Sequence, residues 1–252
     1  MEEIKEYFRP YPTYEEVFYD DIENHKKHFL PICSVNLKFM FPERDEWVHF
    51  ISVKEIYEGC VGENTPDFHT KYTKEDMLGF IIIDGKYKFE SSWDYFIVNH
   101  DNNSEDMVEE LEEVYDENTY SYEVGKKYFE KYGKIFNNTL NYENVSLNAL
   151  EKMDSKYSDN KKEYPEYFGF IDDIKHQSKE TKEMVEKYNI SLKKIESFKN
   201  TNLPETPKDN DNKVFEYIGR LTGYKFQKYG ADSLYVFQSQ KMKKAVICLE
   251  YT

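Results

Sequence analysis

Hydrophobic and polar residues alternate over residues 32–40 (ICSVNLKFM) and 47–53 (WVHFISV), a spacing that predicts two strands. Two shorter hydrophobic runs, 80–83 and 87–89, flank the dipeptide Asp84-Gly85, which suits a tight type I′ turn. The sequence therefore predicts a hairpin at this point. With a fifth strand expected directly after it, the first hundred residues are predicted to form an antiparallel meander.

Hydrophobic residues three and four apart predict several helices. Residues 14–30 show this spacing first, and Pro31 is expected to end that helix. The same spacing recurs over residues 121–136, around Leu147, Leu150 and Met153, and over residues 178–199. Helices are therefore expected both before the strands and after them.

Residues 101–117 (DNNSEDMVEELEEVYDE) predict a helix of unusual charge, directly after a predicted strand at 93–98. The segment holds nine acidic residues and no basic one. Ser104 suits the N-cap, and acids in the first turn interact favourably with the helix dipole. One hydrophobic stripe follows the helix: Met107, Val108, Leu111, Val114 and Tyr115. Like charges at i, i+4 destabilise a helix by a few tenths of a kcal/mol per pair. A helix does not require this many like charges merely to be soluble.

Three further strands are predicted at 215–221, 233–238 and 245–251, after a linker at 200–212 that holds two prolines and four asparagines. They form a C-terminal meander that either completes the first sheet or builds its own. The fold class expected is α+β, with largely antiparallel sheets and flanking helices. We expect a single domain, residues 1–252. Its possible sub-divisions are an acidic α+β half (1–118), a helical segment (119–200) and the C-terminal meander (213–252).

Aromatic residues are abundant, with 23 Tyr and 18 Phe, which indicates a core built largely from rings. The three cysteines, Cys33, Cys60 and Cys248, are widely spaced and show no CxxC pair, as in reduced cytosolic proteins. The N-terminal residues lack the pattern of a signal peptide, and no apolar run approaches the roughly 20 residues that span a bilayer. A cytoplasmic location is expected.

The formal net charge is −15, and the excess negative charge lies in residues 1–150. Residues 151–252 carry 17 acidic and 19 basic side chains. An acidic surface repels nucleic-acid backbones and anionic lipid and attracts basic proteins over long range. Direct binding to nucleic acid or to a membrane is therefore not expected.

A different chemistry is suggested by Asp67, His69, His100 and Asp101, which occur as Asp-Phe-His and Asn-His-Asp. These are ligand types of two-metal phosphoesterases, in which paired cations clamp a phosphate. The rest of that pattern is absent, because no Gly-Asp-x-x-Asp element and no later Gly-His-x-His occurs. His25 and His28, separated by two lysines, are interpreted as part of a solvated helix face, and His49 as a strand residue in solvent or in a core hydrogen bond.

The function predicted is that of a non-enzymatic binding protein whose acidic surface docks on a basic partner. The partner would be a nuclease toxin or a nucleic-acid-processing complex, and the protein an inhibitor, an immunity-type protein or a nucleic-acid mimic. The predicted partner-binding residues are Glu105, Glu109, Glu110, Glu112, Glu113, Asp116 and Glu117, with Tyr115, Tyr120 and Tyr122 as exposed anchors. No cofactor or metal is predicted, and the oligomeric state stays open. The alternatives are a metal-dependent hydrolase that uses Asp67, His69, His100 and Asp101, and an adaptor with no special acidic site.

Overall fold

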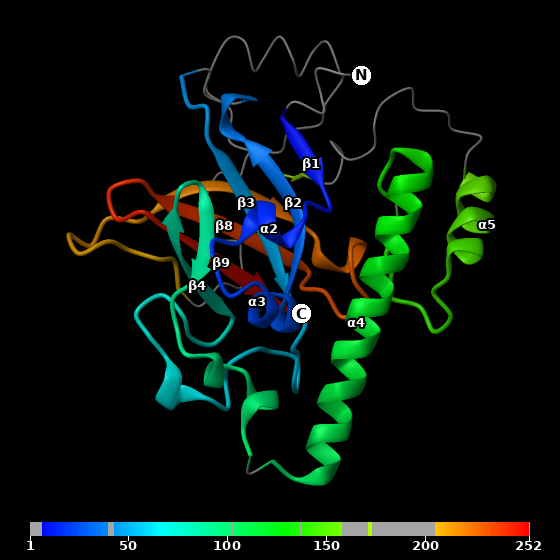
Figure 1. The fold of residues 1–252 in the computed structure, drawn as a ribbon, viewed down its shortest axis with the longest axis horizontal. Coiled ribbons are helices and arrows are strands. Elements are labelled where there is room, and N and C mark those ends of the chain that lie inside the picture. Colours follow the sequence, from blue (N-terminus) through cyan, green and yellow to red (C-terminus); the bar gives the residue numbers. More distant parts are fainter. Residues whose placement is uncertain are drawn as a thin grey trace.

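The computed structural model describes residues 7–39, 43–101, 103–136, 138–157, 171–172 and 205–251. The helix predicted at 178–199 lies outside these residues. In the described part, helices combine with two antiparallel sheets, which confirms the α+β class (Figure 1).

The first sheet has three strands in the order β1-β2-β3: Phe8–Pro10, Phe29–Asn36 and Trp47–Val53. All eight residues of β2 are buried, so both faces of this strand are covered rather than one. The strand begins at Phe29, earlier than predicted, and ends at Asn36, where the short 3-10 helix η1 (Leu37–Phe39) follows. The predicted bounds of β3 are confirmed.

The second sheet has the order β5-β4-β9-β8-β7-β6. Its strands are β4 (Met77–Ile83), β5 (Lys86–Phe89), β6 (Ile171–Asp172), β7 (Glu216–Leu221), β8 (Ser233–Ser239) and β9 (Lys244–Glu250). The C-terminal strands therefore complete a sheet with the 77–89 hairpin, and β4 pairs with β9. The prediction of one five-stranded meander in the first hundred residues is wrong, because the hairpin pairs with the C-terminal strands instead of with β3.

The hairpin between β4 and β5 is confirmed as a two-residue turn. Ile83 pairs with Lys86, and Asp84 and Gly85 both have positive φ, 49° and 78°. A type I′ turn requires positive φ at both central residues, which Asp-Gly tolerates well.

The helix predicted at 14–30 is two shorter helices, α2 (Tyr14–Val17) and α3 (Ile22–His28). A capping box between Thr13 and Glu16 begins α2. The chain then leaves helical geometry because Phe18 pairs with Tyr87 and Asp21 adopts a φ of 47°. Pro31 lies inside β2 and ends no helix.

The two helices predicted at 101–117 and 121–136 are one continuous helix, α4 (Glu105–Tyr132). In Figure 1 it rises from the bottom of the molecule beside the sheets, next to α5 (Leu147–Tyr157). The strand predicted at 93–98 is wrong. This segment forms the 3-10 helices η3 (Trp93–Tyr95) and η4 (Ile97–Asn99); two more, η2 (Pro66–Phe68) and η7 (Gly223–Lys225), occur in loops.

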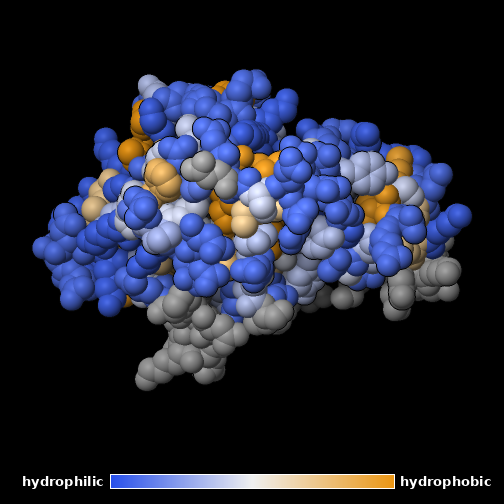
Figure 2. Space-filling model, turned by 90° about the horizontal axis from the view of Figure 1, so that it is seen from below, coloured by the Kyte–Doolittle hydropathy of each residue, from blue (hydrophilic) through white to orange (hydrophobic). Residues whose placement is uncertain are grey.

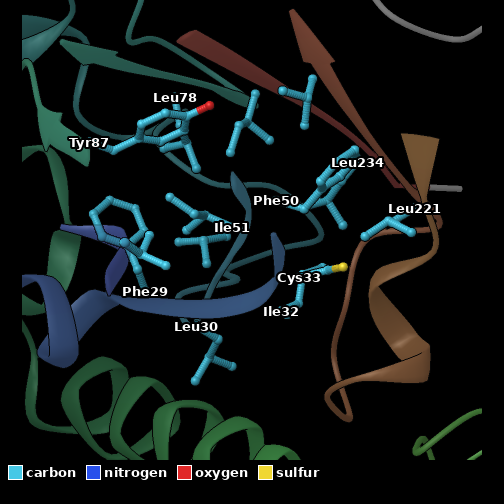
Figure 3. Close-up of a cluster of buried hydrophobic side chains, with 14 of the residues drawn as sticks. Phe29, Leu30, Ile32, Cys33, Phe50, Ile51, Leu78, Tyr87, Leu221 and Leu234 are labelled. Carbon is cyan, nitrogen blue, oxygen red and sulfur yellow. The ribbon is translucent and has the colours of Figure 1, made fainter. Parts of the chain in front are cut away.

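The main core joins the two sheets and is rich in rings, as predicted (Figure 3). Phe29 packs edge to face on Phe80 and Phe89, with ring centroids 5.4 and 5.3 Å apart. On the opposite side of β2, Leu30 points toward α4 (Figure 3). The first sheet thus contacts α4 with one face and the second sheet with the other. Among the described residues, no helix combines the length and apolar character needed to cross a bilayer.

Candidate functional site

Helix α4 is defined by strong local signals at both ends. The Ser104 hydroxyl accepts a hydrogen bond from the Met107 amide at 3.3 Å, which confirms the predicted N-cap. Gly133, at φ 67°, ends the helix in the left-handed conformation that glycine adopts without a side-chain clash. The resulting 28 residues present one face to the protein and the other to solvent.

The attached face of α4 is held by buried polar groups as well as by packing. Asn118 is fully buried; its amide nitrogen donates to the Lys54 carbonyl at 2.8 Å, and its amide oxygen accepts from the Tyr229 amide at 2.8 Å. The Tyr122 hydroxyl donates to the Pro31 carbonyl at 2.9 Å. These bonds satisfy polar groups that would otherwise be costly to bury, and they fix the helix against β2 and β3.

Six of the predicted acids are exposed on the outer face of α4: Glu105, Glu109, Glu110, Glu112, Glu113 and Asp116; Asp106 of the first turn is exposed as well. Within the described part of the chain, none of the six forms an ion pair. The N-terminal end of α4 points downward in Figure 1, and Figure 2 shows the molecule from that side. Hydrophilic residues cover most of this view, and its hydrophobic areas are small and separate.

Glu117, the seventh predicted acid, is half-buried and forms an ion pair with Lys228. Burial alone would raise the pKa of this carboxyl, but hydrogen bonds from Lys228 and Tyr229 and the Lys228 charge lower it. Glu117 thus joins α4 to the loop before β8. Its carboxylate already has a cationic partner within the protein, Lys228.

The three tyrosines predicted as exposed anchors differ in burial. Tyr120 is 58% exposed, as expected. Tyr122 is 2% exposed, so its predicted exposure is wrong; it continues the attached stripe of the helix. Tyr115 is half-buried, and its hydroxyl lies 2.8 Å from Nδ1 of His28. Whether the helix contacts a partner stays a prediction.

His28 lies in a buried polar network behind α4, which corrects its interpretation as a solvated residue. Its ring stacks on Phe96 with centroids 4.0 Å apart, and none of its surface is exposed. The Asn99 amide nitrogen, 3.1 Å away, donates to Nε2, so Nδ1 carries the proton and donates to Tyr115. Burial lowers the pKa of His28 to about 2, and the ring is neutral at pH 7.

The network ends at Glu55, a buried carboxyl below Tyr115. Its oxygens accept hydrogen bonds from the amides of Ile97 and Val98 at 3.0 and 3.2 Å and from the Tyr115 hydroxyl at 3.3 Å. Burial raises the pKa of Glu55 to about 7, although these hydrogen bonds act in the opposite direction. The two amide bonds also hold η4, where a strand was predicted.

His25, the second histidine of α3, is also buried, with 1% of its surface exposed. Its Nε2 accepts a hydrogen bond from the Phe89 amide at 3.2 Å, and its Nδ1 lies 3.0 Å from the Asp21 carbonyl. Both histidines are thus buried and bond to groups of the protein, so neither belongs to a solvated helix face.

The residues of the metal-hydrolase alternative lie in neighbouring loops. The ring of Phe68 is 5.4 Å from that of His100. Nε2 of His69 lies 2.7 Å from the Gly62 carbonyl oxygen, and Nε2 of His100 lies 2.6 Å from the Asp94 carbonyl oxygen. Asp67 and Asp101 are exposed. In the described ranges, no group of three or more His, Cys, Asp or Glu side chains is placed to hold a metal ion.

A second constellation, which sequence reasoning missed, pairs Ser34 of β2 with His49 of β3. Ser34 Oγ lies 2.7 Å from Nδ1 of His49, and Nε2 of the same ring lies 3.0 Å from the Gly85 carbonyl. Burial lowers the pKa of His49 to about 4. The sequence pattern carries no signal for this pair, because Ser34 and His49 face each other only in the observed register of β2 and β3. The core hydrogen bond expected for His49 as one possibility is confirmed.

No protein-family model, no curated protein and no solved structure matches the chain. The features of the structure that bear on function are therefore the acidic face of α4 and the Ser34–His49 pair.

Proposed function

We propose that the protein is a binding protein whose acidic helix α4 docks on a basic protein partner. The observation that supports this most directly is the row of exposed carboxylates over residues 105–116, none of which is ion-paired within the described residues. Neighbouring surfaces behave differently, because Glu117 pairs with Lys228, and Glu151 of α5 with Lys131. Unpaired carboxylates on a fixed helix are available to a cationic surface.

The spacing of these charges suits a partner that binds nucleic acid. At a rise of about 1.5 Å per residue, Glu105 and Asp116 are separated by about 16 Å along the helix axis. With Asp106, seven carboxylates lie over this length, about one charge every 2.5 Å, a density at least as high as that of the phosphates along one DNA strand, which are about 3.4 Å apart. The acidic face would therefore occupy the phosphate-binding channel of a nuclease or a related complex, as an inhibitor or immunity-type protein does.

The attachment of α4 favours this role because the acidic face is held in place before binding. Buried bonds from Asn118, Tyr122 and Tyr115 fix the helix, so little conformational entropy remains to be lost on association. Long-range attraction between opposite charges also speeds association, which makes the rate fall with added salt.

The test combines capture of a partner with charge reversal. The wild-type protein, immobilised at low salt, is exposed to a lysate of the native host, and each retained basic protein is purified. Its Kd is then measured for wild type, for Glu109→Lys/Glu112→Lys and for the control Glu23→Lys/Glu75→Lys. The control has the same net charge and changes acids that are also exposed but belong to other segments, α3 and the loop before β4.

We expect at least tenfold weaker binding for the α4 variant, near wild-type binding for the control, and a Kd that rises steeply with salt. Equal losses in both variants would mean that only net charge matters. Retention of no basic protein would reject the docking function and favour the adaptor.

A further inference from the structure

A cleft of about 690 Å³ opens between the first sheet and the tip of the β4–β5 hairpin. Its lining includes Arg9, Ser34, Trp47 and His49 from the sheet and Gly85 from the turn. None of the six exposed acids of α4 borders this cleft. What the cleft does is therefore separate from the proposed docking of α4.

The strand register places three of these side chains in one row. Arg9 of β1 pairs with Ser34 of β2, and Ser34 pairs with His49 of β3. Directly paired residues of neighbouring antiparallel strands project from the same face, with Cβ atoms about 5 Å apart. The row Arg9–Ser34–His49 thus lies on the face of the sheet that borders the cleft.

The hydrogen bonds of this row determine which atom accepts the proton of the Ser34 hydroxyl. A backbone carbonyl only accepts, so Nε2 of His49 donates to Gly85 at 3.0 Å and Nδ1 holds the free lone pair. Ser34 therefore donates its proton to Nδ1 at 2.7 Å. A hydroxyl, a neutral imidazole that accepts its proton and a third group that orients the ring are the components of an activated serine. Burial lowers the pKa of His49 to about 4, so its imidazole is neutral at pH 7 and able to accept a proton, and it is a weaker base than an ordinary histidine.

We propose that Ser34 is a nucleophile and His49 its general base, and that the cleft hydrolyses small esters. Ser34 Oγ attacks the ester carbonyl carbon while its proton passes to Nδ1 of His49. The bond to the leaving oxygen then breaks, and Nδ1 returns the proton to that oxygen, which leaves an acyl group on Ser34. A water molecule gives a proton to Nδ1 and attacks the acyl carbon; Ser34 Oγ departs and takes the proton back.

The charges around the cleft define the substrate class. Five acidic residues, Glu15, Glu16, Asp45, Glu46 and Asp84, and two basic residues, Arg9 and Lys86, line it. This balance disfavours anionic esters and accepts uncharged or cationic ones. Arg9 lies over Trp47, with its guanidinium carbon 3.8 Å from the ring centroid. Arg9 forms an ion pair with Glu16 at 3.8 Å and is paired with Ser34 in the sheet, so it is the cation of the cleft best placed to stabilise the negative charge that develops on the substrate oxygen.

The pair borders the cleft with little exposed surface, 1% for Ser34 and 4% for His49. A substrate carbonyl must therefore reach the floor of the cleft, so compact acyl groups such as acetyl are the appropriate probes. If the pair served only to fasten the hairpin turn to the sheet, it would not react with such probes.

The decisive experiment treats the full-length wild-type protein with a small fluorophosphonate, which forms a covalent bond with activated serines, and maps the adduct by peptide mass spectrometry. We expect one adduct, on Ser34. In parallel, hydrolysis of p-nitrophenyl acetate is expected to exceed that of the anionic mono-p-nitrophenyl succinate. Because the adduct is mapped on the unaltered protein, the result does not depend on the folding of a variant. Absence of an adduct on Ser34, with a known serine hydrolase labelled in the same solution, would overturn the proposal.

Two variants separate activation from mere accessibility. His49→Gln is expected to lower the labelling rate of Ser34 at least tenfold; the low pKa of His49 places the effect toward the lower end of the roughly 10²- to 10⁴-fold contribution of general bases or below it. Ser52→Ala is the control, since Ser52 belongs to the same strand as His49, is fully buried, and has no hydrogen-bond partner for its hydroxyl among the described residues. It is expected to label at the wild-type rate. Equal labelling of Ser34 in wild type and in a folded His49→Gln variant would reject His49 as the base.

Discussion

The hydroxyl of Tyr115 accepts a hydrogen bond from Nδ1 of His28 at 2.8 Å and so joins the acidic helix to α3. The same hydroxyl donates to Glu55, and Asn99 donates to the other side of the His28 ring. The donors of Asn99, His28 and Tyr115 in this hydrogen-bond network each have an acceptor. The outer face of α4 is charged and solvated, whereas the inner face is anchored by a buried polar chain.

Replacement Tyr115→Phe is expected to lower the free energy of unfolding by about 1–3 kcal/mol, because His28 and Glu55 both lose a buried partner. Urea unfolding followed by circular dichroism measures this loss. The control is Tyr120→Phe on the same helix; Tyr120 is 58% exposed, so a change within about 0.5 kcal/mol is expected. Equal effects of the two replacements would contradict the anchoring role of Tyr115.

Stability is expected to fall between pH 5 and pH 9 because of Glu55. Its pKa is raised from 4.5 to about 7 in the folded protein, so the folded state holds a proton that the unfolded state has released. The stability linked to this group is therefore complete below about pH 4.5 and is lost as the pH rises through about 7. Relative to Glu55→Gln, wild type should lose about 2–3 kcal/mol over this range, measured by urea unfolding at each pH. If the stability of wild type and that of Glu55→Gln changed in parallel with pH, the raised pKa of Glu55 would be contradicted.

Gly125 of α4 is expected to tolerate no large side chain. A Cβ atom there would lie 2.7 Å from the Tyr11 hydroxyl oxygen and 3.0 Å from a methyl carbon of Leu140, and both side chains are buried. Gly125→Leu should therefore destabilise the protein by about 1–3 kcal/mol despite the better helix propensity of leucine. Thermal unfolding measures this, with Glu130→Leu at an exposed position of the same helix as the control. A stabilised Gly125→Leu variant would mean that α4 stands farther from Tyr11 than the structure shows.

The acidic face should itself reduce stability at low salt. Glu109 lies four residues from Glu105 and from Glu113, so Glu109→Gln is expected to raise the free energy of unfolding by a few tenths of a kcal/mol. The gain should shrink at 1 M salt, where charges are screened within about 3 Å. Glu117→Gln is the matched comparison and should destabilise, because Glu117 pairs with Lys228. The same sign for both replacements would contradict the division of α4 into a free and a paired face.

Local patterns predicted local structure well. The Asp84-Gly85 turn, the Ser104 cap and the bounds of β3 each depend on a few adjacent residues. Elements that depend on distant partners were missed. Helix 14–30 is interrupted where Phe18 meets Tyr87, and the pairing of β4 with β9 leaves no periodic trace in the sequence.

The same distinction applies to the candidate sites. The exposure of the six acids followed from their charge. The burial of Tyr122 did have a signal, because Leu111, Tyr115, Asn118 and Tyr122 form one i, i+4, i+7, i+11 stripe, but it is visible only if the helix continues past residue 117. The Ser34–His49 pair left no signal in the sequence, because it arises from the register of two strands.

The place of β9 inside the second sheet has a consequence for synthesis. β9 lies between β4 and β8, so the hairpin at 77–89 has its sheet neighbour only after residues 244–250 have left the ribosome. Until then, β4 presents an unpaired and largely apolar edge, Met77 to Ile83, to every other nascent chain. Pairing across more than 160 residues also makes folding slow. During synthesis, the protein therefore passes through a period in which its own fold does not cover the β4 edge and pairing with another chain is possible.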